Sequence, residues 1–231
     1  MTAKSAMILA AGRGERLAPL TDVTPKPLLK IAGKPLIDHH LHALAHAGIT
    51  QVTVNIAHLS QQIVAHLNDV RPDHIRVDFS HEPQGALETG GGIRNALGLI
   101  ESDPFIVVNA DIWTDFSFAS LPDTIEGLAH LVLVQNPQHH PGGDFALHDG
   151  MVQKIDDGPS ATLTYSGIGL YRKRLFEGCS SSRFPLAPLL NEAARADQLS
   201  GEVYRGNWMD IGTPQRLEQA RCQAEGNLRQ P

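Results

Sequence analysis

The chain has 231 residues, a formal net charge of −6, and a composition that is 42% hydrophobic and 19% charged. This composition is typical of a globular protein and excludes intrinsic disorder, while the acidic balance argues against a nucleic-acid partner, which requires a basic surface. Because every apolar run is shorter than the roughly 18 residues of a membrane span, we expect no membrane partner and a cytoplasmic location.

Short apolar runs alternate with helix-like segments over the first half of the chain. The pattern predicts strands at 6–11, 51–56, 75–79 and 104–109, and helices at 35–48, 60–67 and 91–99. This alternation favours a Rossmann-like, doubly wound α/β fold, with a mostly parallel sheet and helices on both faces. Ligands bind beyond the carboxyl ends of the strands in such sheets, so we expect the loops at Gly12, Glu82 and Asp111 to converge on one edge.

The second half of the chain is rich in strands. The pattern predicts strands at 129–134, 144–148, 151–155, 163–171 and 202–204, and helices at 185–196 and after Thr213-Pro214. Asp149-Gly150 lies between two of these runs and indicates a tight hairpin turn. No linker or internal repeat separates the two halves. We therefore expect one domain over residues 1–231, and we favour a monomer.

The glycine-rich loop that begins at Gly12 is a candidate phosphate site. Glycines let backbone N–H groups approach phosphate oxygens closely, and Arg13, Arg16 and Lys26 supply the positive charge that an acidic chain otherwise lacks. Prolines on both sides of Lys26 restrict the backbone to extended conformations, which holds the lysine in place. Leu17 excludes a dinucleotide-binding fingerprint, which needs a small residue there. The loop is suited to a polyphosphate.

Two aspartates are candidate ligands for Mg²⁺. Asp111 follows the buried run 105–109, so its carboxylate should project from the end of a central strand into the same crevice. Mg²⁺ takes one or two carboxylates plus substrate phosphates, so a second acidic residue should approach from elsewhere in the chain. Asp210 is the best candidate. Taken alone, Asp210 could equally be a turn residue near a helix cap at Thr213, but together with Asp111 and the loop it favours metal binding.

Histidine and cysteine patterns suggest no further site. His39, His42 and His46 would share one face of a helix, but no carboxylate at matching spacing supports a metal site, so an ordinary solvated face is favoured. Cys179 and Cys222 lie far apart without metal-ligand spacing. We expect both to be free thiols.

Residues 9–28 resemble the signature of the sugar-1-phosphate nucleotidylyltransferases, and 208–214 resemble the second metal-ligand motif of that family. The resemblance implies a nucleoside triphosphate, with UTP favoured, and a sugar 1-phosphate as substrates, and Mg²⁺ as cofactor. It implies that Arg16, Lys26 and Asp111 are catalytic and that Asp111 and Asp210 hold the metal. It also implies nucleotide contacts from Leu9, Ala11, Gly12, Arg13, Gly14, Glu15, Arg16, Lys26, Glu82, Ala86 and Thr89.

The second half departs from the pattern of the family. Relatives commonly carry a Glu-Lys-Pro motif whose lysine meets the sugar phosphate, whereas residues 154–159 read Lys-Ile-Asp-Asp-Gly-Pro. Residues 88–92, Glu-Thr-Gly-Gly-Gly, also depart from the Gly-Thr-Ala-Gly form of the base-binding loop, so Glu82 as a base contact and a flexible helix entry both stay open. We expect the strand-rich second half to bind the sugar phosphate. The candidates for the sugar pocket are Asn109, at the border of this half, and Asp144, Tyr165, Ser166 and Gly167 within it.

The resemblance leaves several substrates open. The combination of Glu-Thr-Gly-Gly-Gly at 88–92, Trp-Thr-Asp at 113–115, Gly-Gly-Asp-Phe at 142–145 and Tyr-Ser-Gly-Ile at 165–168 most resembles members that transfer UMP from UTP to N-acetylmuramate 1-phosphate. The alternatives are GTP with mannose 1-phosphate, dTTP or UTP with glucose 1-phosphate, and CTP with a phosphorylated alcohol. A catalytically silent regulatory subunit of the same fold is the non-enzymatic alternative.

Overall fold

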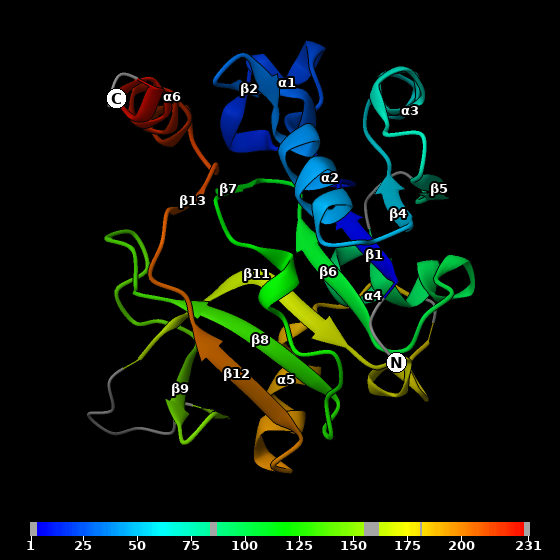
Figure 1. The fold of residues 1–231 in the computed structure, drawn as a ribbon, viewed down its shortest axis with the longest axis vertical. Helices are drawn as coiled ribbons and strands as arrows, with labels where there is room; N and C mark the ends of the chain where they lie inside the picture. The colour runs from blue at the N-terminus through cyan, green and yellow to red at the C-terminus, as the bar shows by residue number, and fades with distance from the viewer. Residues whose placement is uncertain (1–3, 84–86, 155–161, 181, 229–231) are drawn as a thin grey trace.

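A nine-stranded sheet forms the centre of the computed structural model, which describes residues 4–83, 87–154, 162–180 and 182–228 (Figure 1). Within these residues the strand order is β5-β4-β1-β6-β11-β8-β12-β10-β9. Two small sheets accompany it, one formed by β7 and β13 and the other by β2 and β3. None of the helices in the described part of the chain is long and apolar enough to cross a membrane.

The first half of the sheet is parallel. Its strands are β1 (Ser5–Leu9), β4 (Gln51–Ile56), β5 (Arg76–His81) and β6 (Phe105–Asn109), and all three neighbouring pairs run in the same direction. The helices between them are α2 (Leu36–His46), α3 (Ser60–Val70) and α4 (Glu88–Ala96). This arrangement confirms the predicted Rossmann-like α/β fold. β1 ends at Leu9, two residues earlier than expected, which leaves Ala10 and Ala11 in the following loop.

The second half of the sheet is mixed. β11 (Thr164–Tyr171) runs antiparallel to both β6 and β8 (Ala129–Val134), and β12 (Leu199–Val203) runs parallel to β8. β9 (Phe145–His148) and β10 (Met151–Lys154) form the predicted hairpin, with positive φ at both turn residues. β12 begins three residues before the predicted strand, because pairing with β8 recruits a segment that lacks a strand pattern of its own. Ile155 lies outside the described residues.

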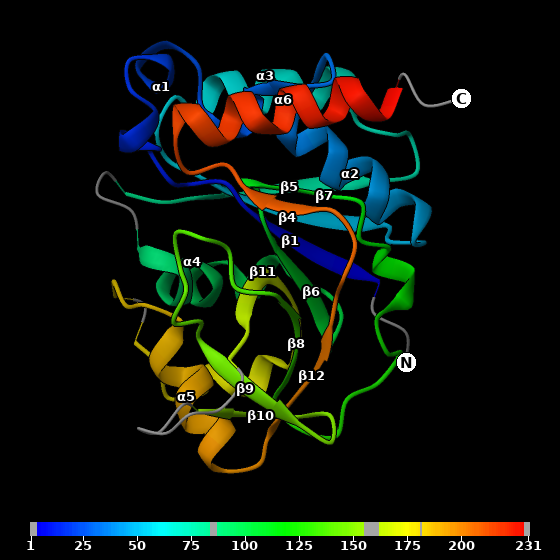
Figure 2. The same cartoon turned by 90° about the vertical axis from the view of Figure 1, so that its left-hand side faces the viewer.

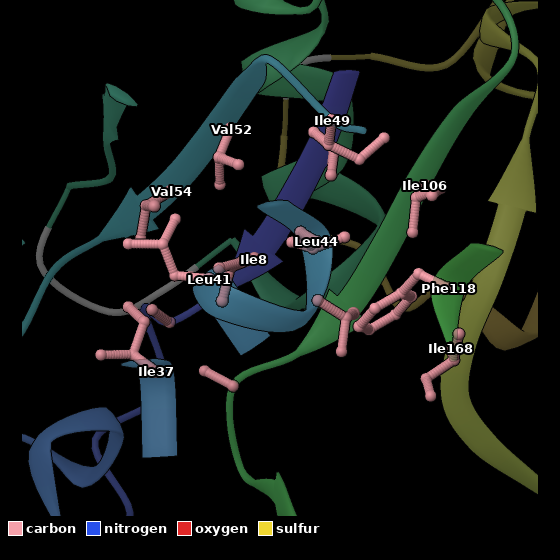
Figure 3. Close-up of a cluster of buried hydrophobic side chains, with 14 of the residues drawn as sticks. Ile8, Ile37, Leu41, Leu44, Ile49, Val52, Val54, Ile106, Phe118 and Ile168 are labelled. Carbon is pink, nitrogen blue, oxygen red and sulfur yellow. The ribbon is translucent and has the colours of Figure 1, made fainter. Parts of the chain in front are cut away.

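Helices cover both faces of the sheet, as predicted. Alternate residues of a strand point to opposite faces, so Ile8 packs in one core with α2 and α3, whereas Met7 packs in another with α4 and α5 (Ala187–Arg195). Figure 3 shows the first core, where Ile37, Leu41 and Leu44 of α2 face the strands. Burying each such side chain contributes roughly 1.5–3 kcal/mol.

The C-terminal helix α6 (Pro214–Leu228) packs against the N-terminal part of the chain. Figures 1 and 2 show α6, in red, beside the blue elements that follow β1. Leu217 and Ala220 of α6 share a third buried core with Leu17 and Leu29. The strand β13 (Trp208–Asp210) directly precedes α6 and pairs with β7 (Ile112–Thr114). The last segment of the chain is thereby held at the same edge of the sheet as the glycine-rich loop.

The remaining elements are short. β2 (Lys30–Ile31) and β3 (Lys34–Pro35) form a small hairpin before α2. The predicted helix 91–99 is α4 followed by the 3-10 turn η3 (Leu97–Leu99). The other short turns are η1 (Glu15–Leu17), α1 (Leu20–Val23), η2 (Lys26–Leu28), η4 (Phe118–Ser120) and η5 (Lys173–Phe176).

Candidate active site

The loop after β1 turns sharply at Gly14. This residue has a φ of 70°, in the left-handed region that favours glycine, and its carbonyl oxygen accepts hydrogen bonds from Leu17 N at 2.8 Å and Thr21 Oγ1 at 2.9 Å. A side chain here would lie 3.2 Å from Lys26 Cδ, whereas one at Gly12 would meet no described atom within 4 Å. Gly14 therefore lets the loop fold back over Lys26, while the backbone at Gly12 faces open space.

Lys26 forms an ion pair with Asp111, the residue that follows β6 by two positions. Lys26 Nζ donates to Asp111 Oδ2 at 2.5 Å, and the lysine side chain is 10% exposed while that of the aspartate is 37% exposed. Pro25 has the extended φ of −61° and ψ of 141° expected from its sequence context. The structure thus joins the lysine of the predicted phosphate loop to the predicted metal ligand.

A pocket and a wider cleft adjoin this ion pair. The pocket has a volume of about 220 Å³ and the cleft about 1070 Å³. Small-molecule sites commonly enclose about 300–1,000 Å³, so the two spaces together have the capacity for a nucleoside triphosphate. Both spaces are lined by Gly14, Lys26 and Glu82, so they meet at the loop.

Most of the predicted nucleotide-site residues line one of these two spaces. Those in the pocket are Leu9, Ala11, Gly12, Gly14, Lys26, Glu82 and Thr89, together with Asn109 and Asp111. Those that line the cleft alone are Arg13, Glu15 and Arg16. Ala86 lies outside the described residues. The loops after β1, β5 and β6 therefore converge on one edge of the sheet.

Four polar or charged residues that the sequence pattern did not single out line the same spaces. Asn55 and Glu88 line the pocket, and His58 and Arg183 line the cleft, with Arg183 Nε donating to Glu88 Oε1 at 2.9 Å. The rule that carboxyl-end loops carry ligand contacts would have found Asn55 and His58, because both lie at the end of the predicted strand 51–56. Arg183 lies far along the chain in a loop, and no sequence signal marks it.

Glu82 is buried and ties the strand ends together. Its Oε1 accepts from Asn55 Nδ2 at 2.6 Å and its Oε2 accepts from Leu87 N at 2.8 Å, while Asn55 Oδ1 accepts from Ala10 N at 2.7 Å. A side chain at Gly92 would lie 2.5 Å from Glu82 Oε1. Glu82 therefore holds one wall of the pocket, and its contact with a base stays a prediction.

The glycine run at the start of α4 makes room for a distant segment. A side chain at Gly90 would overlap the ring of Phe184, and one at Gly91 would lie 2.5 Å from Ser182 O. Phe184 O accepts from Gly91 N at 3.0 Å, and Phe184 N donates to Leu87 O at 3.1 Å. The glycines that depart from the family form therefore let residues 182–184 pack against the start of α4, which places Arg183 at the cleft. The helix begins at Glu88, three residues before the predicted start at 91.

Asp210 lies beside Asp111 because β13 pairs with β7. Asp210 is opposite Ile112 in the register, and Ile211 N donates to Asp111 O at 2.7 Å. The Asp210 side chain is 25% exposed and contacts Arg216 and His139. Thr213 Oγ1 accepts from Arg216 N at 3.3 Å, which makes Thr213 the predicted cap of the helix α6.

The donor set at this edge fits Mg²⁺. Two partly exposed carboxylates on adjacent segments offer hard oxygen ligands and leave room for phosphate oxygens, the arrangement that Mg²⁺ favours. Within the described ranges, no group of three or more histidine, cysteine, aspartate or glutamate side chains could hold a metal ion. A metal at Asp111 and Asp210 would therefore complete its coordination with substrate and water.

Two of the predicted sugar-pocket residues meet at the end of β6. Gly167 has a φ of 83°, and a side chain there would lie 2.6 Å from Asn109 Nδ2. Asn109 lines the pocket. The neighbouring Ser166 is buried, with its Oγ accepting from Ile168 N at 3.2 Å and its carbonyl oxygen accepting from Trp208 Nε1 at 2.9 Å. Gly167 is thus required for the close approach of Asn109.

Tyr165 and Asp144 have structural partners outside both spaces. The hydroxyl groups of Tyr165 and Tyr171 share a hydrogen bond of 2.7 Å, and burial raises the pKa of both. Asp144 Oδ2 accepts from Tyr165 N at 2.8 Å. The register of β11 shifts between Tyr165 and Ile168, so a bulge turns this stretch of the strand. The ring of Tyr165 therefore extends the core, and sugar contacts from Tyr165 and Asp144 stay predictions.

The histidine-rich helix anchors the site through a residue that the spacing did not single out. His40 is buried in α2 and its Nε2 donates to Ile112 O at 2.9 Å, one residue after Asp111. Burial lowers the pKa of His40 to about 4. His39 donates to Ile31 O at 3.1 Å and His46 to His42 O at 2.8 Å, so these two side chains bind carbonyl groups.

Comparisons with known proteins identify the family. Residues 5–227 match the family model described as nucleotidyl transferase. The chain is 47% identical over 228 residues to N-acetylmuramate alpha-1-phosphate uridylyltransferase of Neisseria meningitidis serogroup B, covering 95% of this chain and 97% of that protein. It is 34% identical over 240 residues to the Caulobacter vibrioides protein of the same name, covering 97% of each.

Solved structures show the same fold. A putative glucose-1-phosphate thymidylyltransferase from Bacillus anthracis superposes with a TM-score of 0.84 at 19% identity, covering 95% of this chain and 94% of that one. The inositol-1-phosphate CTP transferase from T. maritima superposes with a TM-score of 0.79 at 14% identity, covering 97% of each. These identities are low enough that the likeness speaks for the fold alone. The match over residues 5–227 and the relatives of 47% and 34% identity show that the chain belongs to the nucleotidyl transferase family.

Proposed function

We propose that the chain transfers UMP from UTP to N-acetylmuramate 1-phosphate, giving the UDP-sugar and pyrophosphate. The observation that carries this proposal is the meeting of the pocket and the cationic cleft at Lys26, whose ammonium group is paired with Asp111. We assign the nucleoside to the pocket and the triphosphate to the cleft. The relative that is 47% identical over nearly the full length supports the choice of base and sugar.

Positive charge and open backbone supply the triphosphate contacts. Arg13, Arg16 and Lys26 line the cleft, and a side chain at Gly12 would meet no described atom within 4 Å. Guanidinium and ammonium groups form charge-assisted hydrogen bonds with phosphate oxygens, which are roughly twice as strong as neutral ones. The nucleotide would therefore bind with its phosphates over the loop and its base towards Glu82 and Thr89.

The reaction needs positioning and charge neutralisation more than acid–base chemistry. An oxygen of the sugar 1-phosphate attacks the α-phosphorus of UTP in line, a new P–O bond forms, and the bond to the pyrophosphate leaving group breaks. The attacking oxygen is already anionic at neutral pH, so no general base is required. Arg16 and Lys26 neutralise the charge that builds up on the leaving group.

Asp111 and Asp210 are the residues that would hold Mg²⁺. A bound Mg²⁺ supplies further neutralisation of phosphate charge. The sugar would lie towards Asn109 and Gly167, next to the end of β6. The segment that replaces the Glu-Lys-Pro motif falls mainly on residues outside the described ranges. We further infer that the enzyme acts in the cytoplasm as a monomer.

A panel of substrates tests the proposal. UTP, GTP, dTTP and CTP would each be incubated with Mg²⁺ and with N-acetylmuramate, mannose or glucose 1-phosphate, and released pyrophosphate would be measured. The proposal predicts the highest kcat/KM for UTP with N-acetylmuramate 1-phosphate. A higher value for GTP with mannose 1-phosphate would reassign the substrates, and no release with any pair would favour a catalytically silent subunit.

A further inference from the structure

Both carboxylate oxygens of Asp210 already have basic partners. Arg216 Nη1 lies 2.8 Å from Asp210 Oδ1 and 2.7 Å from Oδ2, and His139 Nε2 lies 3.0 Å from Oδ1. The Arg216 side chain is 12% exposed, so this ion pair is largely shielded from water. The carboxylate that we assign to Mg²⁺ is therefore neutralised by a side chain of the protein.

The same arrangement recurs at the other assigned ligand. Lys26 Nζ lies 2.5 Å from Asp111 Oδ2, and its side chain is also shielded from water. A divalent cation and a basic side chain that bind the same carboxylate oxygens compete for their lone pairs, and the two cations repel each other. A metal that takes the Asp210 lone pairs facing Arg216 must therefore displace the guanidinium group.

The guanidinium group of Arg216 has one donor that Asp210 does not satisfy. Its Nε is buried and has no hydrogen-bond partner among the described residues. Gly212 separates Arg216 from the cleft, since a side chain there would overlap the Arg216 guanidinium and would lie 3.1 Å from Arg16 Nη2. Gly212 and Arg16 both line the cleft that we assign to the triphosphate. Arg216 thus lies between Asp210 and a cationic space suited to phosphate.

We propose that Arg216 acts through Asp210 as a positioning residue, because its guanidinium group competes with Mg²⁺ for the carboxylate oxygens and is displaced when the metal binds. The inference rests on the proposed function, because it takes Asp210 as a metal ligand. It gives Arg216 a role beyond anchoring the first turn of α6. If Arg216 only held Asp210 in place, it would increase the affinity for the metal. As a competing cation, Arg216 decreases that affinity.

The direction of a change in metal affinity distinguishes these two roles. Binding of Mn²⁺ alone, without nucleotide, would be measured by electron paramagnetic resonance for the wild type, Arg216→Gln and Arg216→Lys. We expect Arg216→Gln to bind Mn²⁺ about tenfold more tightly, equal to about 1.4 kcal/mol. We expect Arg216→Lys, which keeps the charge, to stay close to the wild type. Arg221→Gln, on the same helix and partly exposed, is the matched control and should not change the affinity.

Failure of the inference and failure of the metal site give different results. Weaker or unchanged Mn²⁺ binding by a folded Arg216→Gln variant, with normal binding by the wild type, would overturn the role of Arg216 alone. If Asp210→Asn binds Mn²⁺ as tightly as the wild type, the metal assignment is overturned, and the inference is overturned with it.

A measurement on the wild type covers the case in which Arg216→Gln does not fold. The ¹⁵Nε signal of Arg216, assigned by its loss in Arg216→Lys, should shift on titration with Mg²⁺, while that of Arg221 stays in place. An Arg216 signal that does not move at saturating Mg²⁺ would contradict displacement.

Discussion

At the scale of single residues, the site depends on pairs of opposite charge that the fold partly buries. Lys26 and Asp111 form one pair, and Arg216 and Asp210 form the other. Breaking a pair leaves one charge without its partner in a poorly solvated place. In the proposed function, these charges also contact phosphate or metal. Substitution of one member of a pair should therefore lower activity far more than stability when the member that remains is partly exposed to water.

Removal of the ammonium group of Lys26 tests the phosphate role. We expect Lys26→Ala to lower kcat by a factor of roughly 10²–10³, the usual effect of losing one preorganised charge-stabilising donor. Circular dichroism should show a folded protein. Lys30→Ala, an exposed lysine outside the cleft, is the control. Near-normal turnover in folded Lys26→Ala would show that another cation neutralises the leaving group.

Asp111→Asn tests the metal role at the same scale. We expect this variant to lose turnover by orders of magnitude and to bind Mn²⁺ more weakly, because an amide oxygen carries no charge. Turnover and Mn²⁺ affinity would be measured on the same preparation. A variant that loses neither would contradict the assignment of Asp111.

At the scale of elements, the glycine run of α4 and the buried histidine of α2 decide how segments meet. Gly90 and Gly91 admit the backbone of residues 182–184, and His40 links α2 to the segment that carries Asp111. Each contact joins parts of the chain that are distant in sequence. A small change at one position should therefore loosen a whole segment.

The glycine contact predicts a difference between two alanine substitutions. Gly91→Ala should lower the free energy of unfolding by about 1–3 kcal/mol, because the added carbon meets Ser182 O at 2.5 Å. Gly98→Ala, where a side chain meets nothing within 4 Å, should change it by about 0.5 kcal/mol or less. Urea unfolding would measure both. Equal effects would show that residues 182–184 move aside freely.

The buried histidine predicts a loss of stability in acid. Folding lowers the pKa of His40 from 6.5 to about 4, so the neutral form is favoured in the folded state. Its contribution is fully present above pH 6.5 and is lost as the pH falls from 6.5 towards 4, by about 3 kcal/mol in total. The His40→Gln variant keeps a donor for Ile112 O but does not titrate. Its free energy of unfolding should fall less steeply over this range, and an unchanged slope would contradict the prediction.

At the scale of the whole molecule, the two ends of the chain build one site. The C-terminal segment 208–228 crosses to the N-terminal loop, and the third core of Leu17, Leu29, Leu217 and Ala220 holds it there. Because β13 directly precedes α6, this core sets where Asp210 lies relative to Asp111. For the metal site that we propose, packing between the chain ends is therefore a condition for binding.

This dependence predicts a joint effect of one core substitution. Leu217→Ala should lower the free energy of unfolding by about 2–5 kcal/mol, the usual range for a buried leucine. It should also weaken Mn²⁺ binding, because the anchor of Asp210 loosens. Glu218→Ala, next to it on the exposed side, should change neither. Mn²⁺ affinity equal to the wild type in destabilised Leu217→Ala would show that β13 alone positions Asp210.

Local sequence patterns predicted the parts of the site that follow strands. Asp111 comes after a buried run, and the loop from Gly12 to Lys26 carries its glycines, prolines and charges within one stretch, so short-range rules were sufficient. Arg183, Arg216 and His40 were missed because their roles depend on partners tens of residues away or on burial, which spacing does not encode. The hydroxyl partner of Tyr165 was missed for the same reason.

The most direct test of the account is ³¹P nuclear magnetic resonance of the complete reaction. The purified protein would be incubated with Mg²⁺, UTP and N-acetylmuramate 1-phosphate, with Asp111→Asn as the inactive control. The account predicts that signals of pyrophosphate and of a diphosphate-linked sugar grow in equal amounts while both substrates disappear. If the signals of UTP and the sugar 1-phosphate stay unchanged in the presence of the folded wild-type protein, the account is contradicted.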